Sequence, residues 1–233
     1  MSNELLLFFN LIVIFGMTLW FYLLYGKKGL FCWNIIATIA ANIEVMILID
    51  AFGIEQTLGN IMFASTFLTT DILSENHGKK EASYAVKTGI LASFAFIIIT
   101  RFWISFTPSV NDTMYSSIKT VFTNTPRVMF AGFLVYAIVQ FFDVWLYHKL
   151  WEITTKKFGE RSKMLWLRNN VATLLSQLIN AILFNIFAFA GIYDLKTLIN
   201  IIISTYIIYI MTSLLDTPII YLARKFRKIN DKI

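Results

Sequence analysis

Residues 4–26 read ELLLFFNLIVIFGMTLWFYLLYG and contain a single charged side chain, Glu4. A helix needs about 20 mostly apolar residues to cross a bilayer, and this stretch meets that length. It is too long for the apolar region of a signal peptide, follows no basic segment and lacks a cleavage site of small residues. We therefore expect residues 4–25 to form a helix that stays in the protein and spans a membrane.

Further apolar segments follow, and they predict helices over 30–52, 57–74, 83–106, 126–150, 164–190 and 196–222. Of the 233 residues, 58% are hydrophobic and 15% are charged, whereas soluble domains have about 45–50% apolar and about 25% charged residues. A membrane β-barrel would instead show alternating segments of about ten residues. The sequence thus predicts an all-α polytopic transmembrane helix bundle. It forms one integral membrane domain over 1–233, with a six-helix core over 30–222 and one additional N-terminal helix.

Positive charge is unequally divided between alternate connections. The segments after the first, third, fifth and seventh predicted helices carry Lys27, Lys28, Lys79, Lys80, Lys156, Lys157, Arg161, Lys163, Arg224, Lys225, Arg227, Lys228 and Lys232. The opposite side has only Arg101, Lys119, Arg127 and Lys196. Cytoplasmic loops of membrane proteins are enriched in Lys and Arg, so we expect the N-terminus outside and the C-terminus in the cytoplasm. This anchoring explains the net charge of +6 without nucleic acid as a partner.

Two features modify the simple pattern of spans. Residues 109–122, SVNDTMYSSIKTVF, are weakly amphipathic, and we expect them to lie on the membrane surface. Pro218 lies inside the last predicted helix and should kink or break it, because proline lacks the amide hydrogen that a helix interior uses.

Amide and hydroxyl groups follow one face of the second predicted helix. Asn34, Thr38 and Asn42 are spaced four residues apart, which places them on the same side. Hydrogen bonds between closely packed helices explain Asn34 and Thr38 as well as a cavity does. We expect Asn42 to face a cavity. Glu44 lies on another face and needs a partner or a proton that the sequence does not identify.

The third predicted helix carries an aromatic ring and two carboxyl groups on one face. Phe67, Asp71 and Glu75 are again spaced four residues apart. We interpret Glu75 as a residue at the water-exposed end of the helix, paired with Lys79. Asp71 lies about 6 Å deeper by the helical rise. It either contacts a flat, hydrogen-bonding ligand beside Phe67 or braces the helix.

The fifth and sixth predicted helices carry further polar groups, which are costly in a bilayer and indicate function. In the fifth, Asp143 must be protonated, paired with Arg168 or bound to a ligand. In the seventh helix, Asp216 precedes Thr217 and Pro218. It is either a hydrogen-bonded carboxylate at a kink or part of a gate. The fifth helix carries one row of such side chains, Tyr136, Gln140, Asp143 and Tyr147. The sixth carries a second row, Asn170, Thr173, Gln177, Asn180 and Phe184. We expect the second row to line the bundle interior or a wet cavity.

Enzymatic motifs are absent from the sequence. It contains no GxxxxGK[ST] phosphate loop, no HExxH metal helix and no GxSxG nucleophile elbow. Two His and one Cys do not make a usual zinc site. We therefore expect neither an enzyme, nor a metal site, nor a cofactor. The single Cys32 excludes an internal disulfide, and we interpret it as a small core residue.

Four stretches together resemble the queuosine-precursor transporters, a family also known as vitamin uptake transporters. They are FASTFLTTDILSENHGKKEA (63–82), RVMFAGFLVYAIVQFFDVWLYHKLWEIT (127–154), MLWLRNNVATLLSQLINAILFNIFAFAG (164–191) and DTPIIYLARK (216–225). The resemblance covers about residues 34–224. Family members often have Pro at the position of Ala64 and Asp at that of Asn180, and many carry a Lys near Asn42 where this chain has Glu44 nearby.

The resemblance implies a transporter of the bacterial cytoplasmic (inner) membrane that imports deazaguanine bases, preQ0, preQ1 or queuine, for tRNA modification. Alternating access would move the base, and the substrate-binding residues would be Asn42, Phe67, Asp71, Gln140, Asp143, Gln177, Asn180 and Phe184. Carboxylates and amides accept the N–H groups of a guanine-like edge, and aromatic rings stack on its faces. The resemblance does not decide between proton coupling and facilitated diffusion. It also leaves open whether the protein forms a homodimer.

A second interpretation is a binding module. The chain would then be the substrate-binding subunit of an energy-coupling vitamin transporter that needs ATPase partners. A partner helix could dock on the small residues Ala37, Ala40 and Ala41, although internal packing explains them too.

Overall fold

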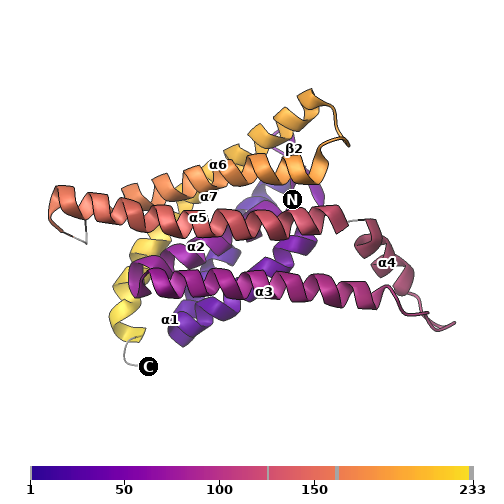
Figure 1. The fold of residues 1–233 in the computed structure, drawn as a ribbon, viewed down its shortest axis with the longest axis horizontal. Coiled ribbons are helices and arrows are strands. Elements are labelled where there is room, and N and C mark those ends of the chain that lie inside the picture. Colours follow the sequence, from indigo (N-terminus) through magenta and orange to yellow (C-terminus); the bar gives the residue numbers. More distant parts are fainter. Residues whose placement is uncertain (1, 125, 161–162, 231–233) are drawn as a thin grey trace.

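The computed structural model of the chain is a bundle of long helices and describes residues 2–124, 126–160 and 163–230 (Figure 1). Arg161 and Lys232, two of the basic residues used for the topology, lie outside these ranges. In chain order the elements are α1 (Asn3–Glu44), β1 (Leu48–Ala51), β2 (Ile54–Thr57), α2 (Gly59–His77), α3 (Lys79–Trp103), α4 (Tyr115–Asn124), α5 (Pro126–Phe158), α6 (Leu165–Phe189) and α7 (Leu195–Asn230).

Five of these helices, α1, α3, α5, α6 and α7, are long and apolar enough to cross a membrane. Their outward surfaces carry large apolar side chains such as Leu6, Phe94 and Ile203, which suit contact with lipid rather than water. The chain is thus a multi-pass helical membrane protein, as the composition predicts.

The first two predicted helices are the two arms of α1, which reverses direction at Gly26. Gly26 has φ 56° and ψ −140°, a conformation that a residue with a Cβ rarely adopts. The rings of Phe21 and Trp33 lie 5.4 Å apart, whereas twelve residues of a straight helix span about 18 Å. A Cβ on Gly29 would lie 2.0 Å from the carbonyl oxygen of Phe21, so the tight reversal requires glycine there too.

The second arm ends at Glu44, and the prediction of a helix to residue 52 is wrong. Residues 48–57 form an antiparallel hairpin in which Leu48 pairs with Thr57 and Ala51 with Ile54. Phe52 and Gly53 both have positive φ, 55° and 72°, as a two-residue hairpin turn of the primed type requires. The chain is therefore helical in its spans but not purely all-α.

The N-terminus is held against this hairpin. The Asn3 side-chain amide donates to the carbonyl oxygen of Asp50 at 2.8 Å, and the Phe52 N–H donates to Glu4 at 3.0 Å. The N-terminal arm is also part of the main apolar core, to which it contributes Leu7, Leu11, Ile14 and Phe15. It is consequently packed into the bundle rather than attached to its outside.

Helix α2 lies at the centre of the bundle. Almost every residue from Gly59 to Asn76 is buried, and α1, α3, α5 and α7 pack around it. Its hydroxyl groups hydrogen bond to carbonyl oxygens one turn back, as Thr69 does to Ser65 at 2.8 Å. Enclosure by protein explains how a helix too polar to count as an apolar span can lie inside the bundle.

The two ends of the bundle differ in charge. At the end of α2 opposite the hairpin, Lys27 pairs with Glu81 at 3.0 Å and Arg224 lies 3.6 Å from Glu75. The connections after α2 and α5 are at this same end (Figure 1). The described basic residues of the predicted cytoplasmic set thus gather at one end, which we call the basic end. The other is the hairpin end.

The other segments between and within the helices agree more closely with what the sequence predicts. Residues 115–124 form the short helix α4, which overlaps the segment 109–122 expected at the membrane surface. Asp194 precedes α7 and accepts hydrogen bonds from the Thr197 hydroxyl and from the N–H groups of Thr197 and Lys196. These bonds hold the pKa of Asp194 below its usual range. Pro218 does not break α7, which continues through it.

Candidate functional site

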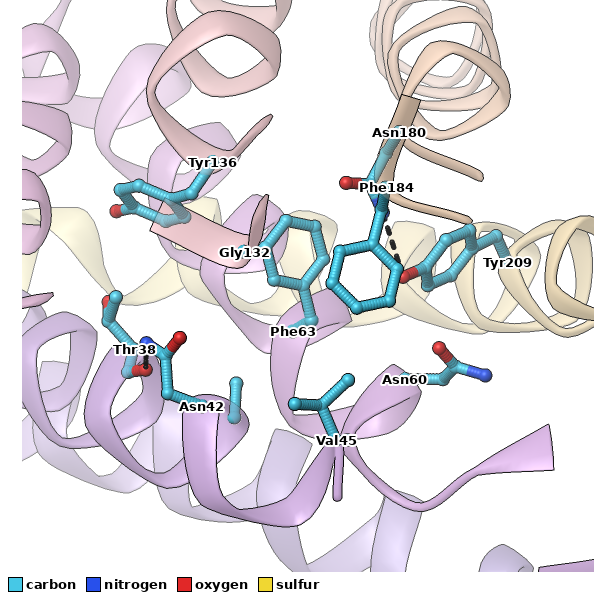
Figure 2. Close-up of a pocket in the computed structure, with 12 residues that line it drawn as sticks. Thr38, Asn42, Val45, Asn60, Phe63, Gly132, Tyr136, Asn180, Phe184 and Tyr209 are labelled. Carbon is cyan, nitrogen blue, oxygen red and sulfur yellow. Dashed lines mark hydrogen bonds between the residues drawn. The ribbon is translucent and has the colours of Figure 1, made fainter. Parts of the chain in front are cut away.

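A small cavity of about 40 Å³ lies toward the hairpin end of the bundle (Figure 2). Helices α1, α2, α5, α6 and α7 all contribute to its wall. The lining residues are Thr38, Ala41, Asn42, Val45, Gly59, Asn60, Phe63, Gly132, Tyr136, Asn180, Phe184 and Tyr209. Because five segments distant in sequence meet here, small relative movements of the helices would change its size.

Aromatic rings form one side of the cavity. The Phe63 ring lies 6.1 Å from that of Tyr136 in an edge-to-face arrangement and 6.4 Å from that of Tyr209. The ring of Phe184 is drawn beside that of Phe63 (Figure 2). A Cβ on Gly132 would lie 3.1 Å from Asn42 Oδ1 and 3.9 Å from the Phe184 ring. Glycine at 132 therefore keeps this part of the cavity open.

Three amides also line the cavity, and that of Asn180 lies beside Phe184 and Tyr209 (Figure 2). Asn180 Nδ2 donates to the Tyr209 hydroxyl at 2.8 Å, and Asn42 Nδ2 donates to the Thr38 carbonyl oxygen at 2.8 Å. Asn60 accepts from Thr57 at 3.2 Å, while its Nδ2 has no hydrogen-bond partner among the described residues. Each amide has one donor and one acceptor group, so the wall can bind a ligand whose edge presents both.

Two of the predicted polar residues have packing roles instead. Asn34 Nδ2 donates to the Tyr136 hydroxyl at 3.0 Å and to the Ala85 carbonyl oxygen at 2.8 Å. Gln140 donates to Thr66 at 2.6 Å and accepts from Thr70 at 3.2 Å. Asn34 thus joins α1 to α3 and α5, and Gln140 joins α5 to α2.

A group of three buried aspartates lies deeper, beyond the cavity. Asp71, Asp143 and Asp216 come from α2, α5 and α7, and at most 2% of each residue is exposed. Asp71 Oδ2 accepts from Thr173 at 3.1 Å, and Asp216 Oδ1 accepts from Asn169 at 2.8 Å. Asp71 lies close enough to the other two for electrostatic interaction. We call these residues the aspartate cluster.

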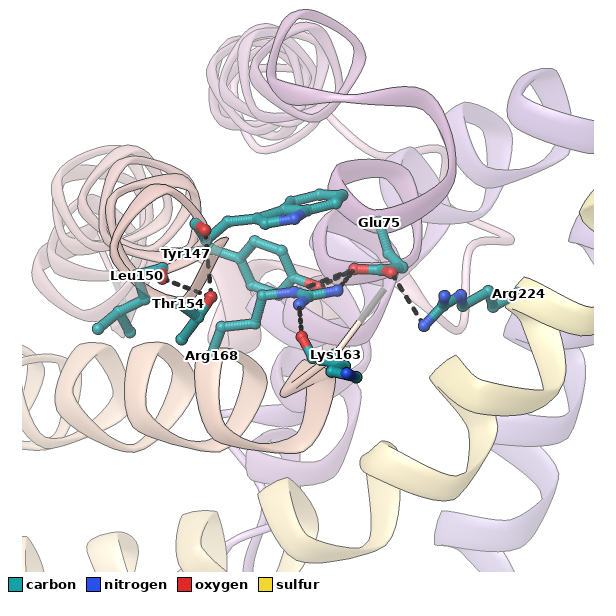
Figure 3. Close-up of polar contacts among 8 residues, drawn as sticks. Glu75, Tyr147, Leu150, Thr154, Lys163, Arg168 and Arg224 are labelled. Atoms are coloured by element: carbon teal, nitrogen blue, oxygen red, sulfur yellow. Dashed lines mark hydrogen bonds and ion pairs between the residues drawn. The ribbon is translucent and has the colours of Figure 1, made fainter. Parts of the chain in front are cut away.

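Glu75 is the centre of a separate ionic network at the basic end (Figure 3). Its Oε2 accepts from Arg168 Nη2 at 2.5 Å and from the Tyr147 hydroxyl at 2.8 Å, and its Oε1 lies 3.6 Å from Arg224. The Arg168 guanidinium also covers the Trp151 ring, 4.3 Å from its centre. This Glu75 network connects α2, α5, α6 and α7.

The network corrects two expectations. Glu75 is buried, with 7% of the residue exposed, and its partners are Arg168 and Arg224 rather than Lys79. Arg168 therefore does not pair with Asp143, whose two carboxyl oxygens have no hydrogen-bond partner among the described residues. The sequence did not show that Glu75, one turn from Asp71, lies next to the start of α6.

Similarity to known proteins identifies the family of the chain. The family model described as "putative vitamin uptake transporter" matches residues 57–223. The chain belongs to this family. The "Probable queuosine precursor transporter" of Bacillus subtilis (strain 168) is 34% identical to it over 224 residues, which cover 96% of this chain and 95% of that protein. No solved structure matches the chain.

Membership of the vitamin uptake transporter family confirms the resemblance inferred from the four stretches, and it agrees with a transporter rather than an enzyme. The structure brings Asn42, Asn180 and Phe184 together at the cavity. Phe67 lies behind the lining, with its ring 5.5 Å from that of Phe63. The other predicted residues, Asp71, Gln140, Asp143 and Gln177, are buried but do not line the cavity.

Several residues that line the cavity were not predicted to contact a ligand. Phe63 precedes Phe67 by four residues and shares its face, so helical periodicity could have found it. Asn60 and Gly132 carry no comparable signal, and Tyr209 lies in an apolar stretch of α7. Of the small residues Ala37, Ala40 and Ala41, the first and last are buried and Ala40 is half-buried, so internal packing explains most of this face.

Proposed function

We propose that the chain imports queuosine precursors, deazaguanine bases such as preQ0, preQ1 or queuine, across a bacterial cytoplasmic membrane for tRNA modification. The observation that carries the proposal is the cavity, which amides and aromatic rings line together (Figure 2). The name of the 34% identical relative supports the same substrate class.

The cavity chemistry suits a flat heterocycle. A guanine-like edge presents N–H groups and a carbonyl oxygen side by side, and the amides of Asn42, Asn60 and Asn180 offer the complementary groups. Phe63 and Phe184 provide ring faces on which a base stacks, an interaction worth about 1–3 kcal/mol per base in nucleic-acid sites. We assign substrate contact to these five residues, with Phe67 supporting Phe63.

The cavity is smaller than its proposed substrate. A volume of about 40 Å³ holds only a few water molecules, so a bicyclic base enters only when helices move apart. Such movement is what alternating access requires. We propose that the structure represents a closed state, that the hairpin end faces outward and that the basic end faces the cytoplasm.

The Glu75 network is the proposed gate at the basic end. It joins four helices through one carboxylate. Beyond it lies a vestibule of about 970 Å³ whose wall includes Glu75, Lys79, Lys156, Arg224 and Arg227. Release of a base into this vestibule requires the contacts between Glu75 and the arginines to separate.

Ligand-dependent stabilisation of the purified protein tests the substrate assignment. A ligand present at about 100 times its Kd adds roughly 2.7 kcal/mol to the free energy of unfolding. We expect this for deazaguanine bases and not for unrelated vitamins. Asn180→Ala should reduce the shift in unfolding temperature, whereas Asn185→Ala should retain it, because Asn185 donates to the Ala181 carbonyl oxygen and does not line the cavity. Equal shifts in both variants would contradict the site.

A further inference from the structure

The aspartate cluster has a property that the substrate cavity does not explain. Its three carboxyl groups are fully enclosed by α2, α5, α6 and α7. Among the described residues, none of the three forms an ion pair with Lys, Arg or His. A carboxylate away from water needs a cation, a proton or several hydrogen-bond donors.

Charged and titratable groups on the helices around the cluster have partners of their own. Glu75 of α2 binds Arg168 of α6, Arg224 of α7 and the Tyr147 hydroxyl of α5. On the α1 side, the Tyr22 hydroxyl accepts from Asn76 at 3.0 Å and lies 3.3 Å from His77. On the α3 side, Glu81 pairs with Lys27.

Neighbouring polar groups are buried and unsatisfied. Oδ1 of Asp71 and both carboxyl oxygens of Asp143 have no hydrogen-bond partner among the described residues. Ser176 is fully buried with its hydroxyl next to the Asp143 carboxyl, and it has no other partner within the described part of the chain. Asn169 donates to Asp216 while its Oδ1 is unpartnered there. Buried unsatisfied groups of this kind are uncommon and call for a missing partner.

From these contacts we propose that Asp71, Asp143 and Asp216 bind a transported proton, so that import of the base is driven by a proton gradient. This inference rests on the proposed function and adds its energy source. A proton fits because neutralising one carboxyl of the cluster removes a buried like-charge repulsion and creates an O–H donor for its unpartnered oxygens.

The position of the cluster suits coupling. Along α2, Asp71 is eleven residues from Asn60 in the cavity wall and four from Glu75 in the gate, distances of about 16 Å and about 6 Å by the helical rise. The same four helices that surround the cluster form the Glu75 network. A change of charge at the cluster therefore alters the electrostatic interactions between the same helices that the gate holds together.

Reconstituted liposomes separate this inference from the proposed function. The probe is preQ0, which is a neutral base, so that charge movement cannot come from the substrate. Exchange of labelled for unlabelled base without any gradient tests transport. Accumulation under an imposed pH gradient, acid on the side from which the base is taken up, tests coupling. One coupled proton permits accumulation of about tenfold per pH unit.

Asp143→Asn should lose accumulation and retain exchange, and Asp71→Asn provides a second variant. Retained exchange also shows that the variant is folded. The matched control is Asp194→Asn, which removes an exposed carboxylate and should retain both activities. Exchange by the unmodified protein without accumulation would overturn coupling and leave the proposed function standing. Accumulation that follows a sodium gradient at constant pH would overturn the proton, and absence of exchange would overturn the proposed function itself.

Discussion

At the scale of single residues, Glu75 shows what helical spacing can and cannot predict. The spacing placed Phe67, Asp71 and Glu75 on one face of α2, and all three are buried there. It also favoured Lys79 as the partner of Glu75, because Lys79 is one turn away. The actual partners, Tyr147, Arg168 and Arg224, are at least 72 residues away along the chain. Periodicity gives the face of a helix but not the neighbour that covers it.

Loss of the Glu75 carboxylate should destabilise the protein strongly. Glu75→Gln leaves the fully buried Arg168 without its anion, and breaking such a pair costs about 3–5 kcal/mol. The control is Glu81→Gln, which removes a partly exposed pair with Lys27 and should cost about 0–1 kcal/mol. Thermal unfolding in detergent measures both.

The double variant Glu75→Gln with Arg168→Gln separates pairing from packing. It should be less destabilised than the sum of the two single variants, because removing both charges leaves neither one unpaired. If the losses of stability in the two single variants simply add in the double variant, the proposed pairing of Glu75 with Arg168 is contradicted.

At the scale of elements, the long apolar spans were predicted well and the irregular segments were not. The predicted helix 164–190 corresponds closely to α6, Leu165–Phe189, because length and hydrophobicity are sufficient for such a helix. The hairpin over 48–57 was missed because ILIDAFGI continues an apolar run, although Phe52-Gly53 contains the glycine of its turn. The reversal at Gly26 lies where the sequence predicts a connection between two helices.

Gly26→Ala should destabilise the reversal of α1. The added Cβ strains a backbone with φ 56°, a cost of about 1–3 kcal/mol. Gly16→Ala is the control in the same helix, since Gly16 is exposed and a Cβ there meets no atom within 4 Å. That variant should be neutral or more stable by up to about 1 kcal/mol. Equal losses of unfolding temperature in both variants would argue against a strained turn.

At the scale of the whole molecule, the structure agrees with one basic end and one end that carries the hairpin and the N-terminus. The distribution of Lys and Arg predicts this arrangement, because each apolar span carries the chain to the other side. The cavity could not be predicted in the same way. Its wall combines five helices, and which rows of side chains meet depends on tertiary packing.

Labelling of single cysteines tests the proposed orientation. In a Cys32→Ser background, Ser109→Cys and Ile192→Cys place thiols in exposed connections at the hairpin end, and Lys28→Cys and Glu160→Cys place them at the basic end. A membrane-impermeant maleimide should label the first pair in intact cells and the second pair only after permeabilisation. The opposite pattern would reverse the orientation.

Queuosine in the tRNA of living cells tests the central claim most directly. The host is a bacterial strain that can neither synthesise nor import the precursors, supplied with a low external concentration of deazaguanine base. We predict that the chain restores queuosine in tRNA and that Asn180→Ala restores much less at equal protein in the membrane. Absence of queuosine despite normal membrane insertion of the unmodified chain would contradict the account.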